Sequence, residues 1–304
     1  MLISIVIVNW NTGDLLTECL SSIYDQPSKM DLETIVVDNV STDESVRKAR
    51  AGFPAVRFIC NDTNVGFAAA NNQAIRQAQG QYILLLNPDT VVYPGSLDKL
   101  VLFLEECPQV GAAGPRLLNP DRSLQPSCSP EPTLKTEFLR MFHLGSVRSD
   151  GYYSMEDWDL EAPRQVDVLL GACLLLRRQA IDQVGLLDEA YFVYSEEVDY
   201  CLRLRKAGWR IYWVPQAQVV HYGGQSTRQV AAEMFLQLYQ NKIKYFRKHH
   251  GWLPAVFYKM ILFVAGLGRV AMTPLAWLES SPRRQARLAM VGNYRRLIMA
   301  LPGM

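Results

Sequence analysis

The chain has 304 residues, which is enough for one large domain or for one domain with an appendage. Of these residues, 49% are apolar and 20% are charged, a composition typical of a globular protein with a sizeable core. The net charge of +1 selects no class of partner, and because no nucleic-acid-binding motif occurs, we expect no nucleic acid partner.

Strands and helices alternate over the first hundred residues. The β-branched run LISIVIV at 2–8 predicts a strand, and helical spacing of apolar residues follows it. Further strands are predicted at 33–39, 56–60 and 82–87, and helices at 66–80 and 95–108. Strands without polar alternation, separated by helices, are typical of a parallel sheet covered on both faces. Ligands of such sheets bind beyond the carboxyl ends of the strands, so the four loops there are the predicted functional edge.

The pattern is irregular from about residue 116 to 165, where Pro- and Ser-rich residues precede an acidic and aromatic stretch. We expect a long insertion that crosses the sheet edge, a candidate acceptor loop. A strand that enters a helix is predicted at 166–181, and a helix capped by Ser195 and closed by Gly208 at 195–208. Two apolar runs then lead to a long amphipathic helix at roughly 226–250.

Short polar side chains follow all four early strands. The loops begin with Asn9-Trp10-Asn11, Asp38-Asn39, Asn61-Asp62-Thr63-Asn64 and Asn87-Pro88-Asp89. Asn and Asp also cap helices and fit turns, which explains any single loop. Four such loops at one edge favour a binding site.

A carboxylate at the end of a buried strand needs a cation or a hydrogen-bond donor, because an unpaired buried charge is costly. Oxygen ligands of this kind suit Mg²⁺ or Mn²⁺. Asp89 is therefore a candidate metal ligand, with Pro88 stiffening the turn and Asn87 supplying a neutral oxygen or a hydrogen bond. The tripeptide alone is a weak signal, since Asn-Pro-Asp recurs at 119–121 as a plain turn.

Two further acidic positions are candidates. Asp38 suits the polar edge of a nucleotide, or alternatively the cap of the next helix. Glu196, Glu197 and Asp199 fall in the first turn of the 195–208 helix, where the helix dipole stabilises carboxylates. Glu197 and Asp199 are two residues apart and point to different sides, so one of them can serve as a general base.

His221 ends an apolar strand and precedes Gly223-Gly224. A histidine there is often structural, but the two glycines let the backbone approach a bound phosphate closely. Arg228 follows on the first turn of the next helix.

Seven segments, in chain order, closely resemble family 2 glycosyltransferases, which are inverting enzymes with the GT-A fold. They are SIVIVNWN, IVVDNVSTD, NDTNVGFAAANN, ILLLNPDT, GACLLLRR, YSEEVDYCLRLRKAGW and HYGGQST. The subgroup they resemble is the rhamnosyltransferase-like branch of bacterial polysaccharide synthesis. The match covers roughly residues 2–230, and the ordered set is specific although each segment alone is not.

The resemblance implies an α/β fold of GT-A (Rossmann-like) type, with a mostly parallel sheet and helices on both faces. The catalytic domain would be 1–230, with a nucleotide-sugar half at about 1–115 and an acceptor half at about 116–230. A basic helical extension would occupy 231–304, with membrane association as one of its implied roles.

Roles follow residue by residue from the resemblance. Asn87-Pro88-Asp89 stands at the DxD motif, with Asn in place of the first Asp, so Asp89 would bind the Mg²⁺ or Mn²⁺ that bridges the donor diphosphate. His221 would complete that site, and Asp38 would read a pyrimidine base. Glu197 matches the catalytic base, usually an Asp, with Glu196 and Asp199 as alternatives. The nucleotide-sugar pocket would also contain Asn9, Asn11, Asn64, Gly66, Phe67, Asn71, Asn87 and Arg228.

The implied reaction moves a sugar, with rhamnose favoured, from dTDP-rhamnose or a UDP-sugar to a hydroxyl of a saccharide or lipid-linked acceptor. The setting would be the synthesis of bacterial cell-surface polysaccharide. One alternative is an inactive GT-A module that binds or scaffolds. Another is a nucleotidyltransferase, which would need a Gly-rich, Lys-containing signature near the first strand, and NWNTGD has no Lys.

The C-terminal region is basic. Residues 242–304 contain eleven Lys or Arg and one acid, a charge of +10, which leaves 20 basic (31 less 11) and 29 acidic (30 less 1) residues elsewhere. The apolar stretch 252–278 is interrupted by two prolines and two basic residues, and its longest uncharged piece, 260–268, is shorter than the about 20 residues of a membrane span. Trp252, Trp277 and the later arginines fit an interfacial anchor on an anionic membrane, and the alternative is a helical pair that covers the core or forms a homodimer.

The six cysteines are scattered and mostly lie in apolar runs, which indicates buried thiols in a reducing compartment. Residues 1–4 enter a strand pattern at once, without a basic segment before it. We therefore expect a cytoplasmic protein, at the inner face of the cell membrane if the anchor is real.

Overall fold

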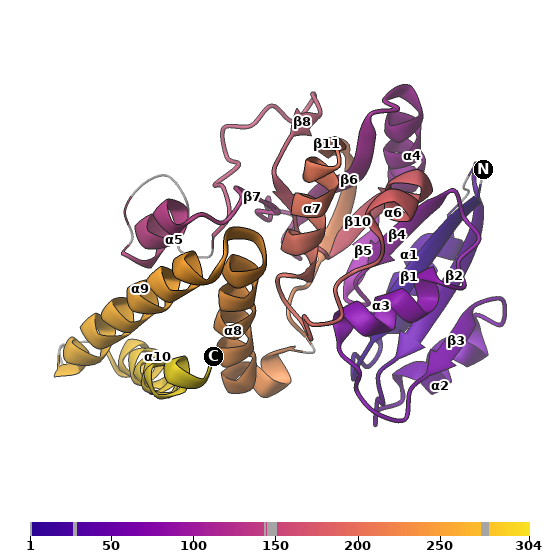
Figure 1. The fold of residues 1–304 in the computed structure, drawn as a ribbon. Coiled ribbons are helices and arrows are strands. Elements are labelled where there is room, and N and C mark those ends of the chain that lie inside the picture. The colour runs from indigo at the N-terminus through magenta and orange to yellow at the C-terminus, as the bar shows by residue number, and fades with distance from the viewer. Residues whose placement is uncertain (1, 27–28, 143, 145–150, 226, 275–279) are drawn as a thin grey trace. The chain divides into compact units, whose positions relative to one another are not determined.

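The computed structural model describes residues 2–26, 29–142, 144, 151–225, 227–274 and 280–304. The chain folds into two compact units (Figure 1). The sheet unit comprises Met1–Glu131 and Tyr152–Gln229, and the helical unit comprises Pro132–Gly151 and Val230–Met304. Residues 132–151, which the sequence analysis placed in the acceptor half, thus group with the C-terminal helices.

The described residues of the sheet unit form a nine-stranded sheet of order β3-β2-β1-β4-β10-β6-β11-β5, with β8 added beside β11. The strands are β1 Leu2–Asn9, β2 Asp31–Asp38, β3 Arg57–Cys60, β4 Tyr82–Leu86, β5 Thr90–Val92, β6 Val110–Leu118, β8 Arg164–Gln165, β10 Cys173–Arg177 and β11 Arg210–His221. The first four strands in this order are parallel, as are β6 and β11. The predicted mostly parallel α/β sheet is confirmed, with β10, β5 and β8 running antiparallel.

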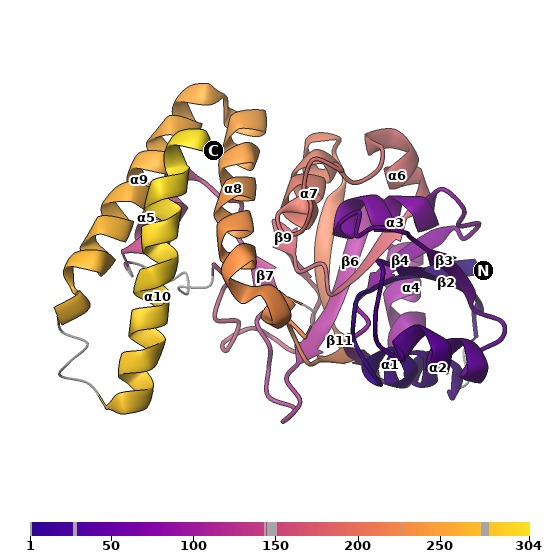
Figure 2. The ribbon, with the colours of Figure 1, turned by 90° about the horizontal axis from the view of Figure 1, so that it is seen from below.

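Helices cover both faces of this sheet, as the apolar runs predict (Figure 2). Residues of β1 alternate between two apolar clusters, with Ile5 in one and Val6 in the other. The first cluster includes α1 Leu15–Tyr24, α2 Ser45–Gly52 and α4 Ser96–Glu106. The second includes α3 Phe67–Ile75, α6 Arg178–Val184 and α7 Glu196–Lys206. Burial on both faces explains why the strands show no polar alternation.

Two sequence expectations differ from the structure. The two apolar runs before His221 form one long strand, β11, with an irregularity between Val214 and Gln218. Pro215 lies within it, where a bulge tolerates the missing N–H group. The irregular region also contains regular elements, namely β7 Cys128–Ser129, which pairs with β9 Val168–Leu169, and α5 Leu134–Met141.

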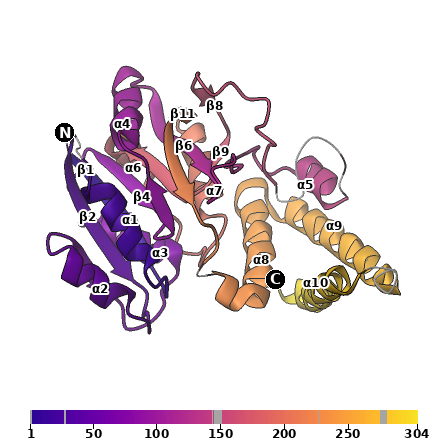
Figure 3. The same cartoon turned by 180° about the vertical axis from the view of Figure 1, so that it is seen from behind.

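The helical unit contains α5, α8 Ala231–His250, α9 Trp252–Ala271, α10 Ser281–Ala300 and the short 3₁₀ helix η3 Leu301–Gly303 (Figure 3). A 3₁₀ turn, η1 Thr227–Val230, precedes α8. Pro254, one of the prolines of the apolar stretch, lies in the first turn of α9, where no intrahelical N–H bond is lost. By length and composition, α9 could cross a membrane, and 28% of its most apolar window is buried.

A buried ionic cluster joins α5 to α8 in the helical unit. Glu137 accepts hydrogen bonds from Arg140 Nη2 at 2.5 Å, Lys242 Nζ at 2.8 Å and the Tyr258 hydroxyl at 3.1 Å. Burial alone would raise the pKa of Glu137, but the charges and hydrogen bonds of Lys242 and Arg140 lower it to about 2. The cluster therefore stabilises the folded state as long as Glu137 is ionised.

We expect Glu137→Gln to lower the free energy of unfolding at pH 7 by about 3 kcal/mol, because it leaves two buried cations uncompensated. The pKa of Glu137 is lower in the folded than in the unfolded chain, so its contribution is complete above about pH 4.3 and is lost as the pH falls toward 2. Urea unfolding of the full chain between pH 2 and 7 measures both effects. Glu44→Gln, which breaks a surface pair with Arg47, should change little. Equal acid profiles for wild type and Glu137→Gln would contradict this prediction.

Candidate functional site

The ends of four strands bring the predicted residues to one edge of the sheet. Asn9 and Asp38 are partners in the register of β1 and β2. Asn87 directly follows β4, which pairs with the other side of β1. His221, the last residue of β11, is the register partner of Thr90 in β5. The polar residues after these strands therefore face the same edge.

Asp38 is buried and bonded within the loop region. Its Oδ1 accepts hydrogen bonds from Asn9 Nδ2 at 2.9 Å and from Ser41 Oγ at 2.6 Å. Its Oδ2 accepts from the Ser41 backbone N–H at 3.0 Å, the contact of a turn or cap. Because each carboxylate oxygen can accept two hydrogen bonds, Oδ2 keeps one acceptor position among the described residues.

Asn11 shapes the same loops. It has a positive φ of 51°, a conformation that Asn tolerates better than most residues. Its Oδ1 accepts the Thr42 N–H at 2.8 Å, and its own N–H donates to Ser41 Oγ at 2.9 Å. In this structure Asn11 therefore ties the loop after β1 to the loop after β2.

The segment from Asn64 to Asn71 starts helix α3. Asn64 Oδ1 accepts the Gly66 N–H at 3.0 Å, and Asn71 Nδ2 donates to the Phe67 carbonyl at 2.9 Å. Gly66 has a φ of 86°, and a Cβ there would lie 2.6 Å from the Phe192 carbonyl oxygen. The Phe67 N–H donates to that same carbonyl at 2.6 Å. Glycine is thus required where the loop before α7 approaches α3.

Asn87, Asp89 and His221 come together beyond β4. His221 Nε2 lies 3.4 Å from Asp89 Oδ1 and 3.3 Å from Asn87 Nδ2. On the other side of the ring, Nδ1 lies 2.8 Å from Gln125 Oε1. Gln125 Nε2 donates to the His221 backbone carbonyl and to Asn119 Oδ1, each at 3.0 Å. These two bonds orient Gln125 Oε1 toward the His221 ring. An Nδ1–H bond to Gln125 leaves Nε2 directed at Asp89.

Asp89 is ionised near neutral pH. Burial alone would raise its pKa, but the hydrogen bond and charge of His221 and the backbone N–H of Gln225 together bring the pKa below its ordinary value. Both side chains are nearly buried, at 7% exposure for Asp89 and 8% for His221. A carboxylate and a ring nitrogen this close need either a proton on Nε2 or a cation between them.

The pair fits a divalent cation. Neighbouring ligands of one octahedral cation, with bonds of about 2.1 Å, lie about 3 Å apart, close to the 3.4 Å between Asp89 and His221. Within the part of the chain that the structure describes, no group of three His, Cys, Asp or Glu side chains forms a metal site. Asp89 and His221 would thus supply two ligands and leave the remaining positions to water and substrate oxygens.

A short segment links Glu197 to this pair. The Ala172 carbonyl accepts the Asn87 N–H at 2.8 Å. The preceding Gly171 lies beside Glu197, since a Cβ added at Gly171 would meet Glu197 Cβ at 3.5 Å, an ordinary van der Waals distance. Glu197 is half-buried in the first turn of α7. Gly171-Ala172 therefore connects the Asn87 loop to the start of α7.

The two neighbouring acidic residues have different surroundings. Asp199 is fully buried and binds Arg203 Nε at 2.8 Å, and Arg203 also donates to the Val184 and Leu186 carbonyls. Glu196 is buried, and its Oε2 has no hydrogen-bond partner among the described residues. Burial and the nearby charge of Glu197 raise the pKa of Glu196 well above its ordinary value. Asp199 thus supports the scaffold, and the surroundings of Glu196 favour its protonated form.

The backbone before α7 is strained. Tyr194 and Ser195 both have a φ of 71°, in the left-handed region that non-glycine residues seldom occupy. The expected Ser195 side-chain cap is wrong, since the residue precedes α7 in this conformation without a capping hydrogen bond. Strain of this kind concentrates at functional sites, which favours this turn as part of one.

The sequence analysis missed Gln125, Gly171 and the Phe192 carbonyl. All three lie outside the ends of the early strands, and only the GACLLLRR segment pointed near one of them. The side chain of Arg228 lies outside the described residues. Hydrogen bonds connect the Asp38 loop to the segment before α7. Asn39 Nδ2 donates to the Gly66 carbonyl at 3.2 Å, and the Phe67 N–H donates to the Phe192 carbonyl.

Comparison with known sequences identifies relatives along most of the chain. The model of the family "Glycosyl transferase family 2" matches residues 4–185. The chain is 32% identical over 298 residues to N-acetylglucosaminyl-diphospho-decaprenol L-rhamnosyltransferase of Mycobacterium tuberculosis (strain H37Rv), across 93% of this chain and 95% of that protein. It is 27% identical over 177 residues to rhamnosyltransferase WbbL of Escherichia coli K12, across 56% of this chain and 66% of that protein.

Solved structures share the fold. The mannosyltransferase PcManGT from Pyrobaculum calidifontis, in complex with GDP-Man and Mn²⁺, is similar with a TM-score of 0.55 and 19% identity, across 99% of this chain and 84% of that one. GalNAc-T7 with UDP, GalNAc and Mn²⁺ is similar with a TM-score of 0.55 and 16% identity, across 72% of this chain and 43% of that one. These likenesses show the GT-A fold that the sequence resemblance implies.

Proposed function

Because the chain belongs to glycosyl transferase family 2 and is a glycosyltransferase, we propose that it transfers a sugar, with inversion, from a nucleotide-diphosphate donor to a hydroxyl of a saccharide or lipid-linked acceptor. Family membership leaves the nucleotidyltransferase alternative without support. The proposed sugar is L-rhamnose and the proposed donor dTDP-rhamnose, since two relatives are rhamnosyltransferases. The proposed setting is the synthesis of bacterial cell-surface polysaccharide.

The observation that carries the proposal is the contact of Asp89 with His221 at the sheet edge, 3.4 Å apart although far separated in sequence. These two residues would hold Mn²⁺ or Mg²⁺. A bound cation would neutralise the charge that develops on the departing diphosphate. An imidazole ligand favours Mn²⁺, because Mg²⁺ prefers oxygen ligands.

Glu197 would act as the base. It would accept the proton of the acceptor hydroxyl, whose oxygen attacks the anomeric carbon on the face opposite the leaving diphosphate and so inverts the configuration. Glu196 suits this role less, since burial and the charge of Glu197 favour its protonated form, which cannot accept a proton. Asp38 keeps its proposed role of binding the pyrimidine base of the donor, and the hydrogen bond from Asn9 fixes its carboxylate. The nucleotide-sugar pocket next to Asp38 would be shaped by Asn64, Gly66, Phe67 and Asn71.

A donor screen tests the proposal. We expect the purified full chain to transfer from dTDP-L-rhamnose to a diphosphate-linked N-acetylglucosamine acceptor, faster with Mn²⁺ than with Mg²⁺. EDTA should abolish the transfer, and Mn²⁺ should restore it. Transfer from UDP-hexoses alone would reject rhamnose as the sugar, and transfer that survives EDTA would reject the metal.

The domain assignment proposed here is a catalytic domain at 1–230 and a basic helical extension at 231–304, with residues 132–151 grouping with the extension. The extension exposes an apolar face on α9. Its exposed large residues recur every three or four positions and are Trp252, Leu253, Val256, Phe257, Met260, Phe263, Val264 and Leu267. Its opposite face is buried in the helical unit, through Ala255, Tyr258, Leu262 and Ala265. Trp277 and the side chain of Arg283 lie outside the described residues.

The proposed partner of this face is an anionic membrane surface. An exposed apolar patch of this extent is typical of an interaction site. The charge of +10 over residues 242–304 complements anionic lipids, and the exposed Trp252 suits the interface of a bilayer. Helix α9 would then lie in the plane of the membrane and keep its other face in the helical unit. This places the enzyme at the inner face of the cell membrane.

We expect the wild type to float with vesicles that contain anionic lipid and not with neutral vesicles. Phe257→Glu with Val264→Glu should abolish flotation, because both positions are exposed on α9 and the new charges oppose burial in lipid. Leu102→Glu, at a similarly exposed apolar position on α4, is the matched control and should float normally. A dimer in solution that the α9 double variant dissociates would identify the face as a subunit interface and reject the membrane proposal.

A further inference from the structure

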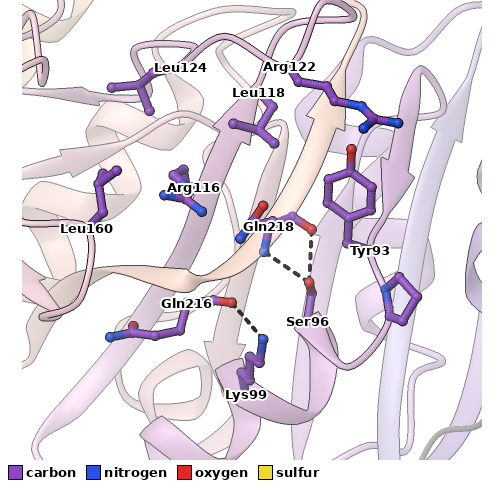
Figure 4. A pocket seen from close by; sticks show the side chains of 11 residues that line it. Tyr93, Ser96, Lys99, Arg116, Leu118, Arg122, Leu124, Leu160, Gln216 and Gln218 are labelled. Carbon is purple, nitrogen blue, oxygen red and sulfur yellow. Dashed lines mark hydrogen bonds between the residues drawn. The ribbon is translucent and has the colours of Figure 1, made fainter.

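A basic pocket lies in the sheet unit beside the candidate metal pair. The pocket has a volume of about 580 Å³, within the range of pockets that bind small ligands. Its walls come from the segment after β5, from α4, from the end of β6 with the turn that follows it, and from β11 (Figure 4). The residues that line this pocket are different from those to which we assigned a role in the candidate site.

The charge of the lining is entirely positive. Lys99, Arg116 and Arg122 line the pocket, and no acidic residue does. Among the described residues, none of these three cations forms an ion pair. Three cations around one cavity repel one another, so the pocket favours an anion.

A buried donor points to the same chemistry. Arg116 Nε is buried and has no hydrogen-bond partner among the described residues. Such a donor is costly to leave unpaired, and a guanidinium is well suited to phosphate oxygens. Lys99 Nζ donates to the Gln216 carbonyl at 3.0 Å and lines another part of the same pocket (Figure 4).

The rest of the lining combines polar residues, Ser96, Gln216 and Gln218, with an apolar part. Leu118, Leu124 and Leu160 line the pocket together with Tyr93. Leu160 is 40% exposed, so part of this apolar surface faces solvent in the absence of a ligand. A ligand that matches both parts of the lining carries an anionic group next to an apolar chain.

The pocket lies a few residues along the chain from the candidate metal pair. Arg116 and Leu118 are register partners of Gln218 and Val220 in β11, and His221 is the next residue of that strand. Leu124, which bridges to Leu118, directly precedes Gln125, the residue that orients the His221 ring. A molecule in this pocket would therefore be anchored within a few residues of the metal pair.

We infer that this pocket binds the diphosphate of a lipid-linked acceptor, with Arg116, Arg122 and Lys99 on the diphosphate and the leucines on the first part of the lipid chain. The inference rests on the proposed sugar transfer, since it names the class of acceptor for that reaction. It also separates the two diphosphates of the reaction, with the donor's at Asp89 and His221 and the acceptor's at Arg116.

The test compares two acceptors that carry the same sugar, one linked to an isoprenyl diphosphate and one a neutral alkyl glycoside. Arg116→Gln and Arg122→Gln should each raise the KM for the diphosphate acceptor at least about tenfold more than the KM for the glycoside, since a charged hydrogen bond is lost. The KM for the donor should change far less. Arg116→Lys should recover part of the affinity, and Arg47→Gln, at an exposed arginine outside the pocket, is the control.

Direct binding distinguishes the sources of a diphosphate. Isoprenyl diphosphate should bind the wild type more tightly than inorganic pyrophosphate or a nucleoside diphosphate, and Arg116→Gln should weaken it. Equal effects of Arg116→Gln on both acceptors, or an increase in the donor KM instead, would overturn the inference. If the wild type transfers no sugar but binds isoprenyl diphosphate through Arg116, the proposed reaction fails while the pocket assignment holds. Circular dichroism and thermal melting of each variant verify folding, and the exposed Arg122 supplies a variant that does not disturb the core.

Discussion

Asp89→Asn should lower the rate of sugar transfer by about 10²- to 10³-fold, because it removes the only negative charge that Asp89 and His221 offer to a cation. The substitution keeps the size of the side chain and so preserves the packing of a residue that is 5% exposed. The loss should appear in kcat at saturating donor and should not be restored by excess Mn²⁺. Steady-state transfer from dTDP-L-rhamnose measures it.

The chain contains its own control for this substitution. Asp121 ends a second Asn-Pro-Asp tripeptide, lies on the surface and accepts hydrogen bonds from the Ser123 side chain and backbone. Asp121→Asn makes the same chemical change in the same local sequence, so its rate should equal that of the wild type. If Asp89→Asn retained the wild-type rate and metal dependence, Asp89 would not be a metal ligand.

The sequence predicted the elements that local apolar patterns define. The runs that became β1, β2, β3 and β4 are short, apolar and bounded by turn residues, so their ends could be located to within two residues. The direction of β10 could not, because the run CLLLR is equally apolar in a parallel or an antiparallel strand. Pairing direction depends on the chain path, which a single run does not encode.

The residues of the candidate site also fall into those that local sequence patterns predict and those that they do not. Asn9, Asp38, Asn87 and Asp89 could be predicted because each follows a strand of a parallel sheet. Gln125 could not be predicted, since its importance comes from a contact with His221, 96 residues away along the chain. The membership of α5 in the helical unit was equally hidden, because it rests on the pairing of Glu137 with Lys242, 105 residues away.

The acidic positions of α7 show what coordinates add to a sequence motif. Glu196, Glu197 and Asp199 are equivalent by sequence, as acids in one helical turn. The structure separates them by their surroundings: Asp199 binds Arg203, Glu196 is buried with a raised pKa, and Glu197 lies beside Gly171, near the Asn87 loop. The separation turns one ambiguous motif into three different expected phenotypes.

Glu197→Gln should lower kcat by about 10²- to 10⁴-fold, because the amide cannot accept the proton of the acceptor hydroxyl. The shape of the side chain is retained, so the packing beside Gly171 and the thermal stability should stay close to those of the wild type. The KM for the donor should change little, since the proposed base contacts the acceptor. Steady-state kinetics with both substrates varied provides kcat and both KM values.

The two neighbouring substitutions make this result specific. Asp199→Asn should mainly lower the melting temperature, because it breaks the pair between the fully buried Asp199 and Arg203, which also donates to the Val184 and Leu186 carbonyls. Glu196→Gln should lower kcat far less than Glu197→Gln, because the surroundings of Glu196 favour its neutral form and the amide keeps that neutrality. If Glu196→Gln instead abolished transfer while Glu197→Gln remained active, the base would be Glu196, and its raised pKa would then appear as a shift of the kcat profile toward higher pH.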